Sequence, residues 1–289
     1  MAGTTVFSAP FDDRTAWAAG RTSAYPEDGR NRADNKLDRI APAYAPTPDG
    51  VFRARRADRG DWRTDLVSTE YAPGGFELLP GDELTATCLV HAQTGAWPAL
   101  WTWGRDRDGG RPQPGHGEVD AFEYHGDNPA VLELTNHVRP AARYADGLIT
   151  PGTPFRLGIV FGADSVDWSV DGATVFTDGV GVGRHWRAWI VVGISVSAGG
   201  YGHPPPAHDA RELQWRCTDL SVRRPRRPAG PRRTGRESRH ASPRGGMIAA
   251  RVGRRGLQGP ATMQVRPTRP VGPPRASPPP PPSETVPLT

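Results

Sequence analysis

The chain has 289 residues, which is enough for one large domain or two small ones. Its formal net charge of +5 is the sum of two opposite parts: the segment from Arg223 onward holds 15 Arg and 2 Glu (+13), and the first 222 residues hold 21 basic and 29 acidic residues (−8). A basic end on an acidic body gives no support for a nucleic-acid-binding domain.

The C-terminal segment, residues 225–289, is rich in Arg and Pro. From Arg223 onward the chain holds 15 of its 32 Pro, five of them in the run Pro278–Pro282, and no Trp, Tyr or Phe. Such a composition buries too little apolar surface to offset the entropy lost on ordering, so we predict a disordered tail. Two interpretations stand, an inert extension and a basic arm that binds an anionic partner.

The sequence shows neither a membrane span nor a signal peptide. No stretch has the length of apolar residues that crosses a bilayer, and the start MAGTTVFSAPFDDRTAW lacks a charged segment followed by an apolar one. Cys88 and Cys217 are far apart in sequence and either pair or stay as buried thiols, and we favour free thiols. We expect a monomer with no cofactor, no bound metal and no membrane partner.

Short apolar runs separated by Gly, Pro, Asp and Asn predict β structure throughout residues 5–224. In chain order, the first clear strand is Glu83–Ala92, in which Leu84, Ala86, Cys88 and Val90 share one face. The next segment, Gly95–Trp103, carries three Trp in seven residues. We expect at least one of these Trp in the core and at least one in a sugar-binding cleft.

The next run, Glu118-Val-Asp-Ala-Phe-Glu123, carries three carboxylates. Retaining glycoside hydrolysis needs two carboxyl groups about 5–5.5 Å apart. Strand alternation puts Glu118 and Asp120 on one face and Glu123 on the other, so a β-bulge near Ala121-Phe122 is required to return Glu123 to the face of Glu118. The alternative is an acidic strand edge that faces solvent.

Three carboxylates this close cannot all ionise freely, so at least one pKa should be raised. A raised pKa on Glu123 makes that residue a general acid near neutral pH. Asp120, hydrogen-bonded to Glu118, is then expected to orient the nucleophile.

The remaining strands complete an all-β pattern. Val166–Val170 and Ala173–Phe176 flank Asp171-Gly172, which predicts a hairpin, and Trp189–Val196 is apolar enough to be buried on both faces. Leu213–Val222 alternates again and closes the domain. Many short strands over about 220 residues predict a two-sheet β-sandwich or jelly roll.

Two blocks resemble glycoside hydrolase family 16, the laminarinase, lichenase and carrageenase group with a concanavalin A-like jelly roll. GAWPALW (95–101) is similar to the family's G-x-W-P-A-x-W, and GEVDAFEY (117–124) is similar to its bulged E-[IV]-D-x-x-E-Y. Thr135 and His137 of LTNHV match a T-x-H strand, and VSAGGYG carries Tyr201 where Trp is common. With LQWRCTDLSVRR as the closing strand, the likeness covers residues 5–224 and none of the tail.

The resemblance implies roles for individual residues. Glu118 is the expected nucleophile, Asp120 its assistant and Glu123 the general acid/base. The expected substrate-binding residues are Trp97, Trp101, Trp103, His137 and Asn35. A structural role for His137 is the alternative, and the charged loop between Trp103 and Glu118 departs from the family's shorter apolar linker.

The resemblance also implies a function, a retaining endo-glycosidase acting on β-linked polysaccharide, with β-1,3- or β-1,3/1,4-glucan as substrate. Such a substrate suggests an extracellular location. A transglycosylase with the same residues and a non-catalytic lectin-like domain are the alternatives, because a fold does not fix a function.

Overall fold

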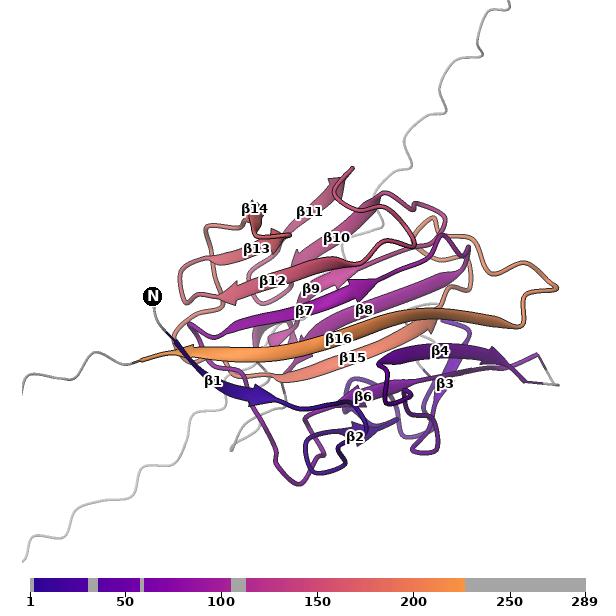
Figure 1. Ribbon diagram of the computed structural model, residues 1–289, viewed down its shortest axis with the longest axis horizontal. Coiled ribbons are helices and arrows are strands. Elements are labelled where there is room, and N and C mark those ends of the chain that lie inside the picture. The colour runs from indigo at the N-terminus through magenta and orange to yellow at the C-terminus, as the bar shows by residue number, and fades with distance from the viewer. Residues whose placement is uncertain (1–2, 31–35, 58–59, 105–112, 227–289) are drawn as a thin grey trace, which may run out of the picture. The chain divides into compact units, whose positions relative to one another are not determined.

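Two sheets pack face to face in the computed structural model, which describes residues 3–30, 36–57, 60–104 and 113–226 (Figure 1). Within these residues, nine strands form one sheet in the order β14-β13-β12-β7-β16-β4-β5-β3, with β1 paired to β16. Their bounds are β1 Gly3–Ser8, β3 Asp38–Ile40, β4 Val51–Arg56, β5 Trp62–Thr64, β7 Glu83–Leu89, β12 Phe155–Phe161, β13 Val166–Val170, β14 Ala173–Thr177 and β16 Glu212–Pro225.

The second sheet has seven described strands in the order β11-β10-β9-β8-β15-β6-β2. Their bounds are β2 Ala18–Ala19, β6 Leu66–Ser68, β8 Ala96–Trp103, β9 Val119–Glu123, β10 Val131–Asn136, β11 Ala141–Asp146 and β15 Trp189–Val196. A short 3-10 helix, Pro114–Gly117, precedes β9. The predicted all-β, two-sheet sandwich is therefore confirmed, and no described helix is long and apolar enough to cross a membrane.

The local predictions follow from strand chemistry. In β7 the buried positions alternate and include Leu84, Ala86 and Cys88, and every residue of β15 is buried. Asp171 and Gly172 both have positive φ (51° and 83°), as the tight turn between β13 and β14 requires.

The two cysteines lie opposite each other on neighbouring strands, Cys88 on β7 and Cys217 on β16. Both are buried and free, as the sequence predicts. Burial is the main reason that the pKa of the Cys88 thiol is raised well above its usual value.

The core between the sheets is rich in aromatic side chains, and two of them hold the opposite sheet by hydrogen bonds. The Trp168 indole of β13 donates to the Asp120 carbonyl oxygen (3.0 Å), and the Trp215 indole of β16 donates to the Gly193 carbonyl oxygen (3.0 Å). Both indoles are fully buried. Each therefore satisfies a backbone acceptor of the seven-stranded sheet from across the core.

The outermost paired strands define the ends of the folded body. Gly3 of β1 pairs with Pro225 of β16, so the strands extend slightly beyond the predicted limits of 5–224. The division into a domain and a tail remains a prediction, because residues 227–289 lie outside the described part of the chain.

Candidate active site

Strand β9, which carries Asp120 and Glu123 and directly follows Glu118, is bulged. On β8, Leu100 pairs with Phe122 and the next residue, Trp101, pairs with Asp120, so Ala121 is an extra residue on β9. The pairing of β9 with β10 shifts at the same place. Ala121 and Phe122 are both buried. The bulge thus turns two consecutive side chains into the core and returns Glu123 to the outer face of the sheet beside Asp120.

The outer face of the seven-stranded sheet holds a cleft of about 670 Å³, and the three carboxylates lie in it. The strand register aligns the lining residues in rows across the sheet. One row runs through Gly193, Ala99, Glu123, Glu133 and Tyr144. The next runs through Trp101, Asp120, Thr135 and Ala142. The first row has small side chains, Gly193 and Ala99, next to Glu123, so the cleft floor is low on that side.

Glu123 has the properties of a proton donor. Burial, together with the negative charge of Asp120, raises the pKa of its carboxyl to about 8. The carboxyl is therefore mostly protonated at neutral pH, as the sequence argument expects for one of the three acids. The Trp97 indole donates a hydrogen bond of 2.8 Å to Glu123 Oε1 and fixes the orientation of the group.

Asp120 and His137 form an ion pair at the other side of the bulge. Their Oδ2 and Nε2 atoms are 3.1 Å apart, and this hydrogen bond is the main cause that raises the pKa of His137 to about 9. A protonated His137 therefore donates to the buried Asp120 carboxylate at neutral pH. The ligand atoms of Glu118, Asp120 and His137 all lie within 4.8 Å of one another, so the three groups act on one small region.

The neighbouring elements hold the start of β9 in place. Thr102 Oγ1 donates to the Gly117 carbonyl oxygen and accepts from the Val119 amide, both at 2.9 Å. The Trp186 indole donates to the same Gly117 carbonyl, also at 2.9 Å. These buried bonds fix the chain just before and after Glu118.

Of the predicted site residues, those within the described part of the chain line one cleft, and Asn35 lies outside that part. Trp97 is 7% exposed and counts among the buried apolar side chains, as expected for at least one Trp of β8, and it lines the cleft as well. Trp97, Trp101 and Trp103 are separated by even numbers of residues, so strand alternation directs all three to the cleft face. Ala96 and Leu100 supply the core side of this strand instead.

Other cleft residues were not predicted from the sequence. Glu133 lies two residues before Thr135 on the same strand, so the alternation of β10 was a signal for its position. Lys36, His125, Tyr201 and His203 also line the cleft. They lie outside the regular strands, and their positions depend on tertiary contacts that the local sequence pattern does not predict.

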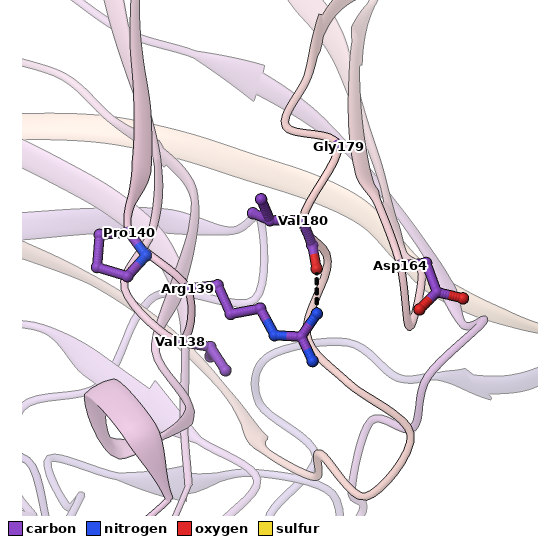
Figure 2. A pocket seen from close by; sticks show the side chains of 6 residues that line it. All are labelled: Val138, Arg139, Pro140, Asp164, Gly179 and Val180. Carbon is purple, nitrogen blue, oxygen red and sulfur yellow. Dashed lines mark hydrogen bonds between the residues drawn. The ribbon is translucent and has the colours of Figure 1, made fainter.

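A second pocket of about 570 Å³ lies elsewhere (Figure 2). Its lining residues are Val138, Arg139, Pro140, Asp164, Gly179 and Val180. The Arg139 guanidinium donates a hydrogen bond to the Val180 carbonyl oxygen, and Asp164 is the one carboxylate in this lining. A single carboxylate does not supply the pair that glycoside hydrolysis needs.

Similar folds are found among solved structures, although no protein-family model matches the sequence and no curated protein is significantly similar to it. The endo-β-1,3-glucanase of Pyrococcus furiosus superposes with a TM-score of 0.59 and 18% identity, over 77% of this chain and 94% of that one. The laminarinase catalytic domain of Thermotoga maritima gives 0.59 and 19%, over 78% and 100%.

This chain has the laminarinase fold. Identities below 20% extend the likeness to the fold alone. The same fold is also found in an immunostimulatory antigen and pseudo β-1,3-glucanase of Mycobacterium tuberculosis, with a TM-score of 0.56 and 18% identity over 78% of this chain and 100% of that one. This fold therefore occurs both in proteins described as β-1,3-glucanases and in one described as a pseudo β-1,3-glucanase, so activity has to be inferred from the site residues.

Proposed function

We propose that this chain is a retaining, endo-acting hydrolase of β-linked glucan. The observation that carries the proposal is that two glutamates, Glu118 just before β9 and Glu123 at its end, line one cleft, with the pKa of Glu123 raised to about 8. A carboxyl kept protonated beside two other acids is the arrangement that acid-catalysed glycoside cleavage requires.

In the first step, Glu118 attacks the anomeric carbon while Glu123 gives its proton to the departing glycosidic oxygen. This forms a covalent glycosyl–enzyme ester and releases the first sugar product. Glu123 is now a carboxylate and takes a proton from an incoming water, whose oxygen displaces Glu118. The Asp120–His137 ion pair stays in place through both steps and keeps the negative charge beside Glu118 oriented.

The aromatic side chains of the cleft suit a sugar polymer. Trp97, Trp101, Trp103 and the exposed Tyr201 all line it, and aromatic faces pack against the C–H faces of sugar rings. The solved laminarinases and endo-β-1,3-glucanases with the same fold favour β-1,3- or mixed β-1,3/1,4-glucan as the substrate. A polysaccharide is the one partner that the proposal requires.

The test is release of reducing sugar from laminarin and from lichenan by the full chain. Wild type should be active, and Glu118→Gln and Glu123→Gln should lose nearly all activity while they keep their fold by circular dichroism. Proton NMR of fresh product should show the β-anomer first, which reports retention. Equal activity of Glu118→Gln and wild type, or an α-anomer first, would contradict the mechanism.

A second candidate is a sugar-binding domain without turnover, which the similarity to a pseudo β-1,3-glucanase favours. Calorimetric binding of laminarin oligosaccharides by wild type without product formation would support it. A transglycosylase uses the same residues, so it is distinguished by products longer than the substrate in mass spectrometry.

A further inference from the structure

A cluster of two histidines and two carboxylates lies at one end of the cleft, on loops and a strand that the hydrolytic steps do not use. His125 and Asp127 follow β9, Glu133 is on β10, and His203 is on the loop between β15 and β16. The rings of His125 and His203 are stacked with centroids 3.5 Å apart and an interplanar angle of 1°. Segments about 76 residues apart in the chain, at Asp127 and His203, meet there.

The ligand atoms of His125, Asp127 and His203 lie within 4.8 Å of one another. His203 Nδ1 is 3.0 Å from Asp127 Oδ2 and 3.2 Å from Oδ1. Three ligands around a zinc ion at about 2.1 Å each lie about 3.4 Å apart in a tetrahedral site, so the set closes around one ion when the two stacked rings tilt to aim their nitrogens at it.

His125 supplies a second, independent observation. Its side chain is 3% exposed, and its Nδ1 atom has no hydrogen-bond partner among the described residues. A buried polar atom without a partner loses its bonds to water and gains none, so such an atom in a native site needs an explanation. A bound cation that accepts the lone pair of this nitrogen supplies one.

Glu133 lies near the Nε2 atoms of the His125 and His203 rings. Its Oε1 atom is 3.5 Å from His203 Nε2 and 3.9 Å from His125 Nε2. Histidines that bind a metal through one nitrogen usually donate the other N–H to a carboxylate, which fixes the ring and its tautomer. Glu133 is placed to do this for both imidazoles.

We propose that His125, Asp127 and His203 bind one divalent transition metal of the zinc class, with Glu133 as the carboxylate that orients the two imidazoles. Two imidazole nitrogens and a single carboxylate favour zinc over calcium, which takes six to eight oxygen ligands. The ion ties the loop after β9 to the loop after β15. It thereby holds Tyr201 against Trp97, whose ring centroids are 6.0 Å apart, at this end of the cleft.

The site does not depend on the proposed glucan hydrolysis, so its test measures metal binding directly. The full chain, made without a histidine tag and stripped with a chelator, is titrated with zinc chloride by calorimetry. We expect one saturable site per chain. A zinc concentration about 100 times Kd should raise Tm by roughly 5–10 °C, and calcium chloride should not.

Variants locate the site. Asp127→Asn and His203→Gln should each abolish the saturable binding, and Glu133→Gln should weaken it about 10–100-fold. Exposed His185 lies outside the cluster, so His185→Gln is the matched control and should bind as wild type does. Using two loop variants keeps the test decisive if one of them fails to fold.

A second zinc-binding candidate in the same cleft is the group of Glu118, Asp120 and His137, and His137→Gln separates the two. That variant should keep full zinc affinity. Binding that is lost in His137→Gln but kept in Asp127→Asn would overturn the proposal. So would a wild-type chain with no saturable zinc binding, because the cluster would then be a hydrogen-bonded stack without an ion.

Discussion

At the scale of single residues, the pKa of one carboxyl, that of Glu123, is set by its position in the cleft. Glu123 shares a face with Asp120, and burial plus the charge of Asp120 keep its proton on at neutral pH. The raised pKa also makes the native state bind this proton more tightly than the unfolded chain does. Its contribution to stability is therefore complete below the usual glutamate pKa and is lost as pH rises through about 8.

The pH dependence of activity should follow the protonation of Glu123. We expect kcat/KM on laminarin to fall as pH rises through about 8, because Glu123 then loses the proton that the leaving group needs. Asp120→Asn removes a negative charge that raises this pKa, so the alkaline limb should move to lower pH. The measurement is the pH profile of kcat/KM.

The control for that profile is Asp164→Asn, since Asp164 is exposed and lines the other pocket. Its alkaline limb should coincide with that of wild type. An Asp120→Asn limb that stays in place or moves to higher pH would show that another group controls the profile.

At the scale of elements, the bulge in β9 depends on a hydrogen bond from the opposite sheet. Trp168→Phe keeps most of the apolar volume but leaves the Asp120 carbonyl oxygen without its indole donor. We expect a loss of stability of about 1–3 kcal/mol. We also expect a lower kcat, because the same carbonyl belongs to the bulge that aims Glu123.

Trp215→Phe is the matched variant, since the Trp215 indole makes an equivalent bond to the Gly193 carbonyl on β15. Its stability in urea should fall by a similar amount with a smaller change in kcat. If both variants lowered kcat equally, the effect would belong to the packing of the core and not to the bulge.

The small side chains of the cleft floor beside Glu123 lead to a prediction for substrate binding. Ala99 pairs with Glu123 across the sheet and has Gly193 on its other side. Ala99→Phe should fill this part of the cleft and raise KM for laminarin by about tenfold or more. Ala173→Phe, on exposed β14 of the other sheet, should leave KM unchanged.

The bulge could be predicted from the sequence, because a retaining mechanism requires Glu123 to lie on the same face as Glu118. Sequence reasoning missed that the three Trp of β8 share a face, although their even spacing carries that information. The indole of Trp168 was beyond sequence reasoning. Which backbone carbonyl it reaches depends on how the two sheets pack, and strand alternation says nothing about that distance.

At the scale of the whole molecule, the first and last described strands, β1 and β16, pair with each other in the nine-stranded sheet. Arg224 on β16 makes two bonds of 2.7 Å to the carboxylate of Asp82, whose side chain is fully buried. The segment after Val222 therefore belongs partly to the folded body, and the predicted boundary at 224 cuts into β16, which ends at Pro225.

Two truncations test this boundary. A chain that ends at Arg226 should keep the Tm and the activity of the full chain. A chain that ends at Val222 loses the partner of a buried carboxylate, three residue pairs with β1 and one with β7, and should lose about 3–5 kcal/mol in urea unfolding. Equal stability of the two truncations would show that Arg224 contributes nothing measurable.

The bulge also makes this strand tolerant of one kind of genetic change. Ala121 is the extra residue of β9, and its side chain is small and buried, so a large side chain in its place would overpack the core. An in-frame loss of that single codon would instead leave a regular strand in which Asp120 faces outward, Phe122 faces the core and Glu123 faces outward. Natural variants of this chain should therefore tolerate the loss of residue 121 better than a large side chain at that position.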